Sequence, residues 1–136
     1  MKFVVIGLLL LACSSGPVKV KVGKDQCDFC RMTIMEENFA GEIVTAKGKV
    51  YMYDDLSCLL KHNNQESKKM EGAELYIANY LNGSQFLKTS EAFYVKAAAL
   101  KSPMAGNVAA LAFEADAESL AKEKDGQLIT LDDVLD

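Results

Sequence analysis

The stretch EIVTAKGKVYMYDDLSCLLKH, residues 42–62, predicts a β-hairpin that is followed directly by a helix. Two strand-like segments, residues 42–46 and 49–53, flank a Lys-Gly pair that suits a tight turn. Asp54 is expected to be the N-cap of a helix over residues 55–62, because its side chain can accept a hydrogen bond from a free backbone N–H of the first turn. The predicted order is therefore strand, strand, helix.

The remainder of the chain repeats this order less clearly. Val18, Val20 and Val22 alternate with lysines, which favours a strand over residues 18–22. The other predicted elements are strands at residues 74–80, 93–98, 108–114 and 127–130, a turn at Asn82-Gly83, a helix over residues 117–124 capped by Asp116, and a helical turn at residues 131–135. Both halves place a methionine-bearing loop (Met32, Met104) ahead of strands and an Asp-capped helix, which suggests an internal duplication.

The composition indicates a globular protein with soft metal-ligand chemistry. The chain has 136 residues, 50% of them hydrophobic and 25% charged, which allows one domain or two very small ones. Its 15 basic and 19 acidic side chains give a net charge of −4, and no run of Lys or Arg exceeds two residues, so nucleic-acid binding is not expected. Four cysteines and six methionines, against a single histidine, argue against a histidine-based metal site.

Residues 1–12 have the features of a lipoprotein signal peptide. Lys2 precedes an apolar run that is too short to span a membrane, for which ~20 apolar residues are needed. Leu10-Leu11-Ala12-Cys13 resembles the lipobox of bacterial lipoproteins, in which the cysteine is lipidated and becomes the first residue of the mature chain. The alternative is an ordinary signal peptide with an incidental cysteine.

A lipid anchor at Cys13 would hold the protein on a membrane of the cell envelope, facing the periplasm, on either the inner or the outer membrane. The expected organisation is then a lipidated tether over residues 13–23 and a globular region over residues 24–136, with possible halves at residues 24–72 and 73–136.

Cys27-Asp28-Phe29-Cys30-Arg31-Met32 places three sulfur atoms within six residues. Two thiolates and a thioether suit Cu(I), which prefers sulfur ligands, and a copper site is the favoured interpretation. Structural zinc is one alternative, but it usually takes four ligands. A thioredoxin-like redox pair is another alternative, but such a pair lies at a helix N-terminus within a βαβ layout. A structural disulfide is also consistent with an oxidising compartment.

Cys58 and His62 lie one helical turn apart on the predicted helix, a spacing that would allow a metal pair. A free cysteine is more often a small buried hydrophobe, so packing is the favoured role of Cys58, and His62, among polar neighbours, is expected to be solvated. Helix capping suffices to explain Asp54 and Asp55. The chain has no Ser/His/Asp arrangement, phosphate loop or nucleotide fingerprint, and we do not expect an enzyme.

Several segments together resemble the NosL family, lipoprotein accessory factors of nitrous oxide reductase. Residues 27–32 are similar to the family's CxxCxM signature, and residues 53–58 to its aromatic-Asp-Asp-x-x-Cys segment. Ala92-Phe93-Tyr94-Val95 resembles a strand of the family's second half, and Ser102-Pro103-Met104 followed by Ala112-Phe113 resembles its Ser-Pro-Met-Gly…Ala-Phe segment. The resemblance covers residues 24–135 in order.

This resemblance implies an α+β fold of two small ββαβ-like halves, similar to that of organomercurial lyase. It also implies a Cu(I) site at Cys27, Cys30 and Met32, with Met104 as a candidate ligand from the second half. The implied role is delivery of copper for the maturation of nitrous oxide reductase, beside an ABC-type transporter complex. The implied partners are these proteins and, through Cys13, the lipid membrane.

Two other classes of function stay open at this point. One is an envelope thiol oxidoreductase that uses Cys27 and Cys30. The other is a metal-free interaction module in which the cysteines form a structural bridge.

Overall fold

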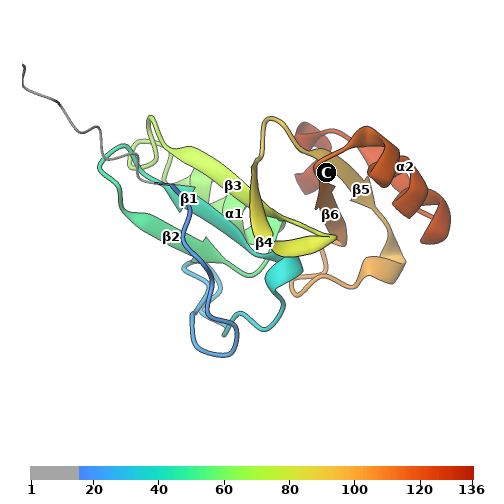
Figure 1. The fold of residues 1–136 in the computed structure, drawn as a ribbon. Helices are drawn as coiled ribbons and strands as arrows, with labels where there is room; N and C mark the ends of the chain where they lie inside the picture. The colour runs from blue at the N-terminus through green and yellow to red at the C-terminus, as the bar shows by residue number, and fades with distance from the viewer. Residues whose placement is uncertain (1–15) are drawn as a thin grey trace, which may run out of the picture.

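The computed structural model describes residues 16–136, which form two β-sheets and two α-helices (Figure 1). The predicted signal peptide at residues 1–12, the predicted lipidation site Cys13 and the first part of the tether lie outside the described residues. No helix within residues 16–136 is long and apolar enough to cross a membrane.

The first sheet has four antiparallel strands in the order β2-β1-β3-β4. Its elements are β1 (Gly41–Val44), β2 (Val50–Tyr53), α1 (Leu56–Gln65), β3 (Glu74–Asn79) and β4 (Asn82–Lys88). All four residues of β1 are buried, because this strand lies between two others. The hairpin and helix predicted from residues 42–62 are therefore confirmed, with β2 at one edge of the sheet.

The second sheet has three antiparallel strands in the order β6-β5-β7. Its elements are β5 (Phe93–Lys96), β6 (Val108–Leu111), α2 (Glu114–Glu123) and β7 (Gln127–Ile129), followed by the 3-10 helix η3 (Leu131–Leu135). In both sheets the first strand is central, the second lies on one side, and the third arrives after a helix on the other side. The predicted α+β fold of two ββαβ-like halves is confirmed.

Three local predictions were wrong. Residues 18–22 form no strand, and Asn82-Gly83 begins β4 instead of forming a turn. β4 was missed because most of its residues are exposed at a sheet edge, so the strand has little apolar alternation. Helix α2 begins at Glu114 with Phe113 as its N-cap, so Asp116 lies inside the first turn and does not cap the helix.

Membership of the sheets differs from the predicted division of the chain at residues 72 and 73. Strands β3 and β4 lie beyond that division but pair with β1 in the first sheet. The chain therefore passes from one sheet to the other between Lys88 and Phe93.

We call the first sheet with α1 the first unit, and the second sheet with α2 the second unit. The two units share part of their hydrophobic core. One face of the second sheet packs against α2, whereas its other face meets the first unit. The shared cluster consists of Leu56, Ile77, Tyr94, Val108, Ala110 and Val134, all buried. Leu56 is the first residue of α1, so the start of this helix is fixed by contacts with both sheets.

Glu42 is a buried carboxyl group in the middle of β1. It has no exposed surface, one of its oxygens accepts a hydrogen bond from Val18 N–H at 2.8 Å, and the other has no partner within residues 16–136. Burial raises the pKa of Glu42 from its ordinary value of 4.5 to about 7, the nearby Asp25 carboxylate raises it further, and the Val18 hydrogen bond opposes both. This bond also fixes the start of the described chain against the first sheet.

The raised pKa predicts that the protein loses stability as the pH rises from about 4.5 to about 7, because the folded state holds the Glu42 proton more tightly than the unfolded chain does. Glu42→Gln should remove this dependence and raise the free energy of unfolding above pH 7 by up to about 3 kcal/mol. Urea unfolding across this pH range measures the effect, with the exposed Glu36→Gln as the control. A Glu42→Gln protein that is less stable than wild type at high pH would contradict the prediction.

Candidate metal site

The junction between β2 and α1 carries two consecutive aspartates with different contacts. Asp55, not Asp54, is the N-cap of α1, and its Oδ1 accepts hydrogen bonds from Cys58 N–H at 3.2 Å and Ser57 Oγ at 2.6 Å. Its Oδ2 accepts from Ser102 Oγ at 3.1 Å and from Met104 N–H at 2.9 Å. The predicted cap was therefore wrong by one residue, and Asp54 is free to point elsewhere.

The CxxC motif lies in a tight loop that is attached to the edge strand β2. Asp28 N–H donates to the Met52 carbonyl at 2.8 Å, and Met52 N–H donates to Asp28 Oδ2 at 2.7 Å. The loop closes on itself through Cys27 N–H to the Met32 carbonyl at 2.8 Å, next to a β-bridge between Gln26 and Thr33. Asp28 thus holds the loop so that both cysteines lie beside the end of β2.

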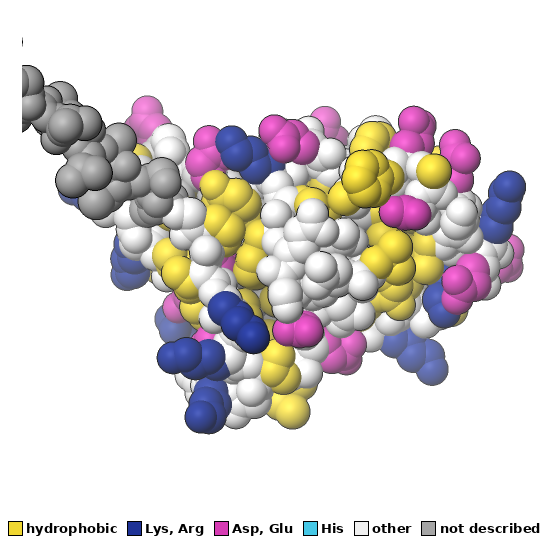
Figure 2. All heavy atoms as spheres, viewed as in Figure 1, with side chains coloured by type: hydrophobic (Ala, Val, Ile, Leu, Met, Phe, Trp, Pro, Cys, Tyr) yellow, Lys and Arg dark blue, Asp and Glu magenta, His cyan; other side chains and the backbone are white. Residues whose placement is uncertain are grey.

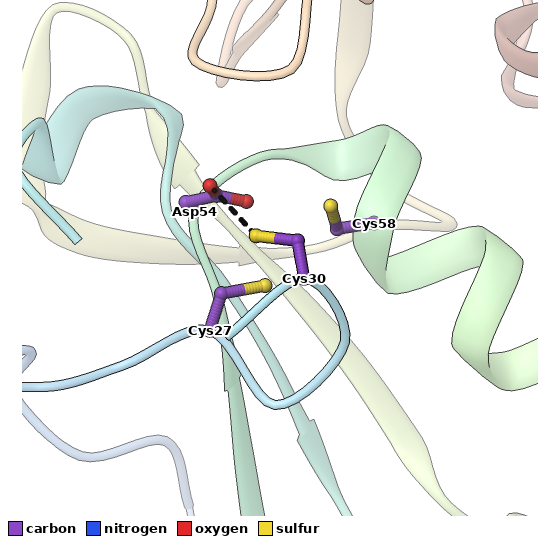
Figure 3. Close-up of side chains that lie close together, drawn as sticks. All are labelled: Cys27, Cys30, Asp54 and Cys58. Atoms are coloured by element: carbon purple, nitrogen blue, oxygen red, sulfur yellow. Dashed lines mark hydrogen bonds between the residues drawn. The ribbon is translucent and has the colours of Figure 1, made fainter. Parts of the chain in front are cut away.

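Four side chains from three segments converge at this point (Figure 3). Cys27 and Cys30 come from the loop, Asp54 from the end of β2 and Cys58 from the first turn of α1. Their ligand atoms all lie within 4.8 Å of one another. Cys27, Asp54 and Cys58 are buried, and Cys30 is half-buried, so this group of four (the thiol cluster) reaches solvent at Cys30.

The sulfur atoms of the thiol cluster do not ionise independently. The hydrogen bond with Cys58 lowers the pKa of Cys27 to about 6, because a neighbouring thiol stabilises the thiolate, and burial opposes this only in part. The pKa of Cys30 is raised to about 11, mainly by burial, and that of Cys58 is raised by its bond with Cys27 and by burial. The cluster therefore holds one thiolate and two thiols near neutral pH, and the cysteines are free in this structure.

Asp54 is buried with an incomplete set of hydrogen bonds. Its Oδ2 accepts from Cys30 Sγ at 3.3 Å, but its Oδ1 has no partner within residues 16–136. An oxygen left without a partner in the interior is costly unless another group pairs with it. Three sulfur atoms and this carboxylate form a donor set that can hold a thiophilic metal ion.

The structure places the predicted site residues in different surroundings. Cys27 and Cys30 lie together, as their spacing requires. Met32 is in the same loop with its side chain 58% exposed, and Met104 is in the 102–107 loop with its side chain 38% exposed. Through Asp55, the Met104 backbone is tied to the start of α1, next to the thiol cluster.

Sequence reasoning missed two members of the cluster. It assigned Cys58 to packing and Asp54 to capping, whereas the structure turns both side chains toward Cys27 and Cys30. The separation of Asp54 and Cys58 by four residues across a strand-to-helix junction is a signal that was visible in the sequence. Whether Asp54 caps the helix or joins the thiol cluster depends on which aspartate is the N-cap, and the structure identifies Asp55 as that residue.

His62 is half-buried, which corrects the expectation that it is solvated. Its Nδ1 pairs with Tyr53 OH at 2.8 Å, and its ring packs against Tyr51, Tyr53 and Phe29. Burial raises the pKa of Tyr53, so this hydroxyl keeps its proton at neutral pH. The histidine is thus held one turn along α1 from Cys58 by aromatic contacts.

The hydrogen bond between Cys58 and Cys27 leads to a prediction about thiolate formation. Cys58→Ala should raise the pKa of Cys27 above about 6, because the donor to its thiolate is lost, whereas Cys58→Ser keeps a donor and should change it less. A pH titration of thiolate ultraviolet absorbance in reduced, metal-free protein measures both. Equal titration curves for wild type and Cys58→Ala would show that the two side chains do not interact.

Comparison with known proteins identifies the fold and the family of this chain. A crystal structure of the copper chaperone NosL from Shewanella denitrificans has the same fold, with a TM-score of 0.71 at 20% sequence identity over 86% of this chain and 94% of that chain. No curated protein matches the chain by sequence. The NosL family matches residues 17–136, nearly the whole of the described chain, and this protein belongs to that family.

Proposed function

We propose that this protein is a lipid-anchored Cu(I) chaperone of the cell envelope. The observation that carries the proposal is the thiol cluster, in which three cysteine sulfurs and one carboxylate oxygen lie within 4.8 Å of one another in a largely buried site. The solved relative from Shewanella denitrificans is itself described as a copper chaperone.

Copper in its reduced state fits this donor set. Cu(I) prefers soft thiolate and thioether ligands, and the cluster together with Met32 offers four sulfur atoms against one carboxylate. A hard ion such as Mg²⁺ or Ca²⁺ would instead need a majority of oxygen ligands. Because the site has one carboxylate and no histidine, Zn²⁺ in a Cys₃Asp arrangement is the competing metal, and metal analysis separates the two.

Exchange of copper would begin at Cys30, the half-buried member of the thiol cluster. Its Sγ donates a hydrogen bond to Asp54, so the carboxylate is placed to receive the proton that leaves when the metal binds. An incoming sulfur or imidazole ligand from an acceptor would then replace one cysteine at a time. Cargo held by few ligands can leave by such stepwise replacement.

The acceptor that we propose is nitrous oxide reductase, reached with the help of an ABC-type transporter complex. Family membership over residues 17–136 supports this assignment. The protein would have no catalytic role of its own, which agrees with the chaperone described for the solved relative.

The thiol oxidoreductase is a weaker alternative. The CxxC motif lies in a turn beside β2 and does not itself begin a helix, as the cysteine pair of a thioredoxin-like site does. The third thiol and the buried carboxylate also have no evident use in a two-cysteine redox cycle. Turnover of a dithiol substrate without metal would favour the oxidoreductase, and stoichiometric Cu(I) on the reduced protein favours the chaperone.

The thiol cluster predicts a ranking of Cu(I) affinities. Cys27→Ser and Cys30→Ser should weaken binding most, and Cys58→Ser should weaken it by more than the roughly 10- to 100-fold typical of changing a residue that only orients a ligand. Met32→Leu and Met104→Leu should have smaller effects on affinity and larger effects on the rate of transfer, because thioethers are neutral, weaker donors. Competition with a Cu(I) chelator under reducing conditions measures both quantities.

Met35→Leu is the matched control, since Met35 is also exposed but belongs to no proposed site. If the three cysteine variants keep wild-type affinity for Cu(I), the thiol cluster does not hold the metal.

The anchor predicts the distribution of the protein between membrane and soluble fractions. Cys13→Ala should release the protein from membranes without changing its thermal stability, because the anchor is a covalent lipid and no residue of the described fold is changed. Fractionation after a high-salt wash measures this. A Cys13→Ala protein that stays in the membrane pellet would rule out lipidation as the means of attachment.

A further inference from the structure

Four lysines surround a pocket at one end of the first sheet. Lys47 and Lys49 lie in and beside the β1–β2 turn, and Lys68 and Lys69 lie in the loop that follows α1. The pocket has a volume of about 620 Å³, and its other lining residues are Thr45, Ala46, Tyr51 and Glu71. We call Lys47, Lys49, Lys68 and Lys69 the lysine end.

The lysines of the lysine end form no ion pair within the described part of the chain, although Glu71 lines the same pocket. All four side chains are exposed, and none has a carboxylate within 4.0 Å among residues 16–136. The ammonium groups of Lys49 and Lys69 lie 4.4 and 5.5 Å from the centre of the Tyr51 ring. Lys49 and, to a smaller extent, Lys69 lower the pKa of the Tyr51 hydroxyl, because their positive charges favour its anionic form.

The lysine end lies close to the point where the N-terminal segment leaves the sheet. Val18 N–H is bonded to Glu42 in β1, the strand that leads into the β1–β2 turn. Val18 is the fifth residue after Cys13, and an extended chain of that length spans at most about 18 Å. Three further exposed lysines, Lys19, Lys21 and Lys24, follow in the same segment.

Charge is distributed unevenly over the protein. Residues 73–136 contain five lysines and ten acidic side chains, whereas residues 16–72 contain nine of each sign, with Glu42, Asp54 and Asp55 among the buried acids. On the face of the molecule that Figure 2 shows, most Lys and Arg side chains lie over the first sheet and the N-terminal loop. An anionic surface would therefore attract the first unit and repel the second.

We infer that the lysine end binds the anionic headgroups of the membrane to which Cys13 tethers the protein. This inference rests on the proposed anchor, since a short tether keeps the four lysines within reach of the headgroups. Strand β2 connects Lys49 of the lysine end with Asp54 of the thiol cluster, five residues later, a distance of roughly 16 Å along an extended chain. Contact at the lysine end thus turns the thiol cluster away from the lipid, toward a partner in the periplasm.

The test uses residues 13–136 with Cys13→Ser, which keeps every described residue of the fold and carries no lipid. The probe is a vesicle of phosphatidylglycerol mixed one to two with phosphatidylcholine, compared with phosphatidylcholine alone in a co-sedimentation assay at low salt. We expect binding to the anionic vesicles only. Each lysine near such a surface contributes about a fivefold factor, so changing Lys47, Lys49, Lys68 and Lys69 to Gln should lower the partition at least tenfold.

The matched control changes Lys88, Lys101, Lys122 and Lys124 to Gln, which alters the net charge equally at other positions. Lys47→Gln with Lys68→Gln is a second variant that leaves both Tyr51 contacts intact and should show a partial loss. Equal binding by the two fourfold variants, or equal binding to neutral vesicles, would overturn the inference. So would selective displacement by inorganic phosphate at constant ionic strength, which would indicate a phosphate pocket in place of a membrane surface.

Two other measurements separate this inference from the proposed function. The fourfold lysine variant should keep wild-type affinity for Cu(I), because none of its positions belongs to the thiol cluster. A Cys13→Ala protein that stays in the membrane pellet would refute the anchor, whereas the vesicle assay reports on the lysine end alone.

Discussion

The Asp55 carboxylate is the contact on which the rest of the structure depends. It caps α1 through Cys58 N–H and holds the 102–107 loop through Ser102 and the Met104 backbone. With 2% exposure it accepts four hydrogen bonds, so its burial is fully compensated. One buried side chain thus fixes where the helix starts and how the second unit meets the first, and the shared core around Leu56 and Tyr94 then packs against a defined junction.

The position of the cap also decides which side chains meet at the candidate metal site. Because Asp55 occupies the N-cap, Asp54 stays on the strand side and its carboxylate points at Cys30, while Cys58 in the first turn comes back over the same point. A shift of the helix start by one residue would rotate Cys58 by about 100° around the helix and away from the loop. The CxxC motif alone offers two candidate ligands, and the strand-to-helix junction offers the other two.

The elements that local pattern determines were predictable, and those that tertiary contacts determine were not. The β1–β2 hairpin, α1 and the repeated ββαβ order follow from turn residues and caps. The CxxC motif indicates a metal or redox site. Cys58 and Asp54 each have an ordinary local explanation, packing and capping, so only the approach of the 27–32 loop to β2 reveals their shared role. The segment at residues 18–22 alternates like a strand, but Val18 N–H bonds to the buried Glu42 side chain instead of to a neighbouring strand.

The sulfur atoms differ in exposure, and this difference suits a protein that must both hold and release its cargo. Cys27 and Cys58 are buried, Cys30 is half-buried, and Met32 and Met104 reach solvent from two separate loops. A thioether carries no proton and no charge, so an exposed methionine can bind Cu(I) at any pH but only weakly. A cysteine binds strongly only as a thiolate, so a thiol must first lose its proton, and Asp54 is placed to accept that proton from Cys30. For the copper chaperone that we propose, weak donors at the surface and strong donors within would favour capture from solvent, and an acceptor that brings strong ligands of its own would draw the ion out through Cys30.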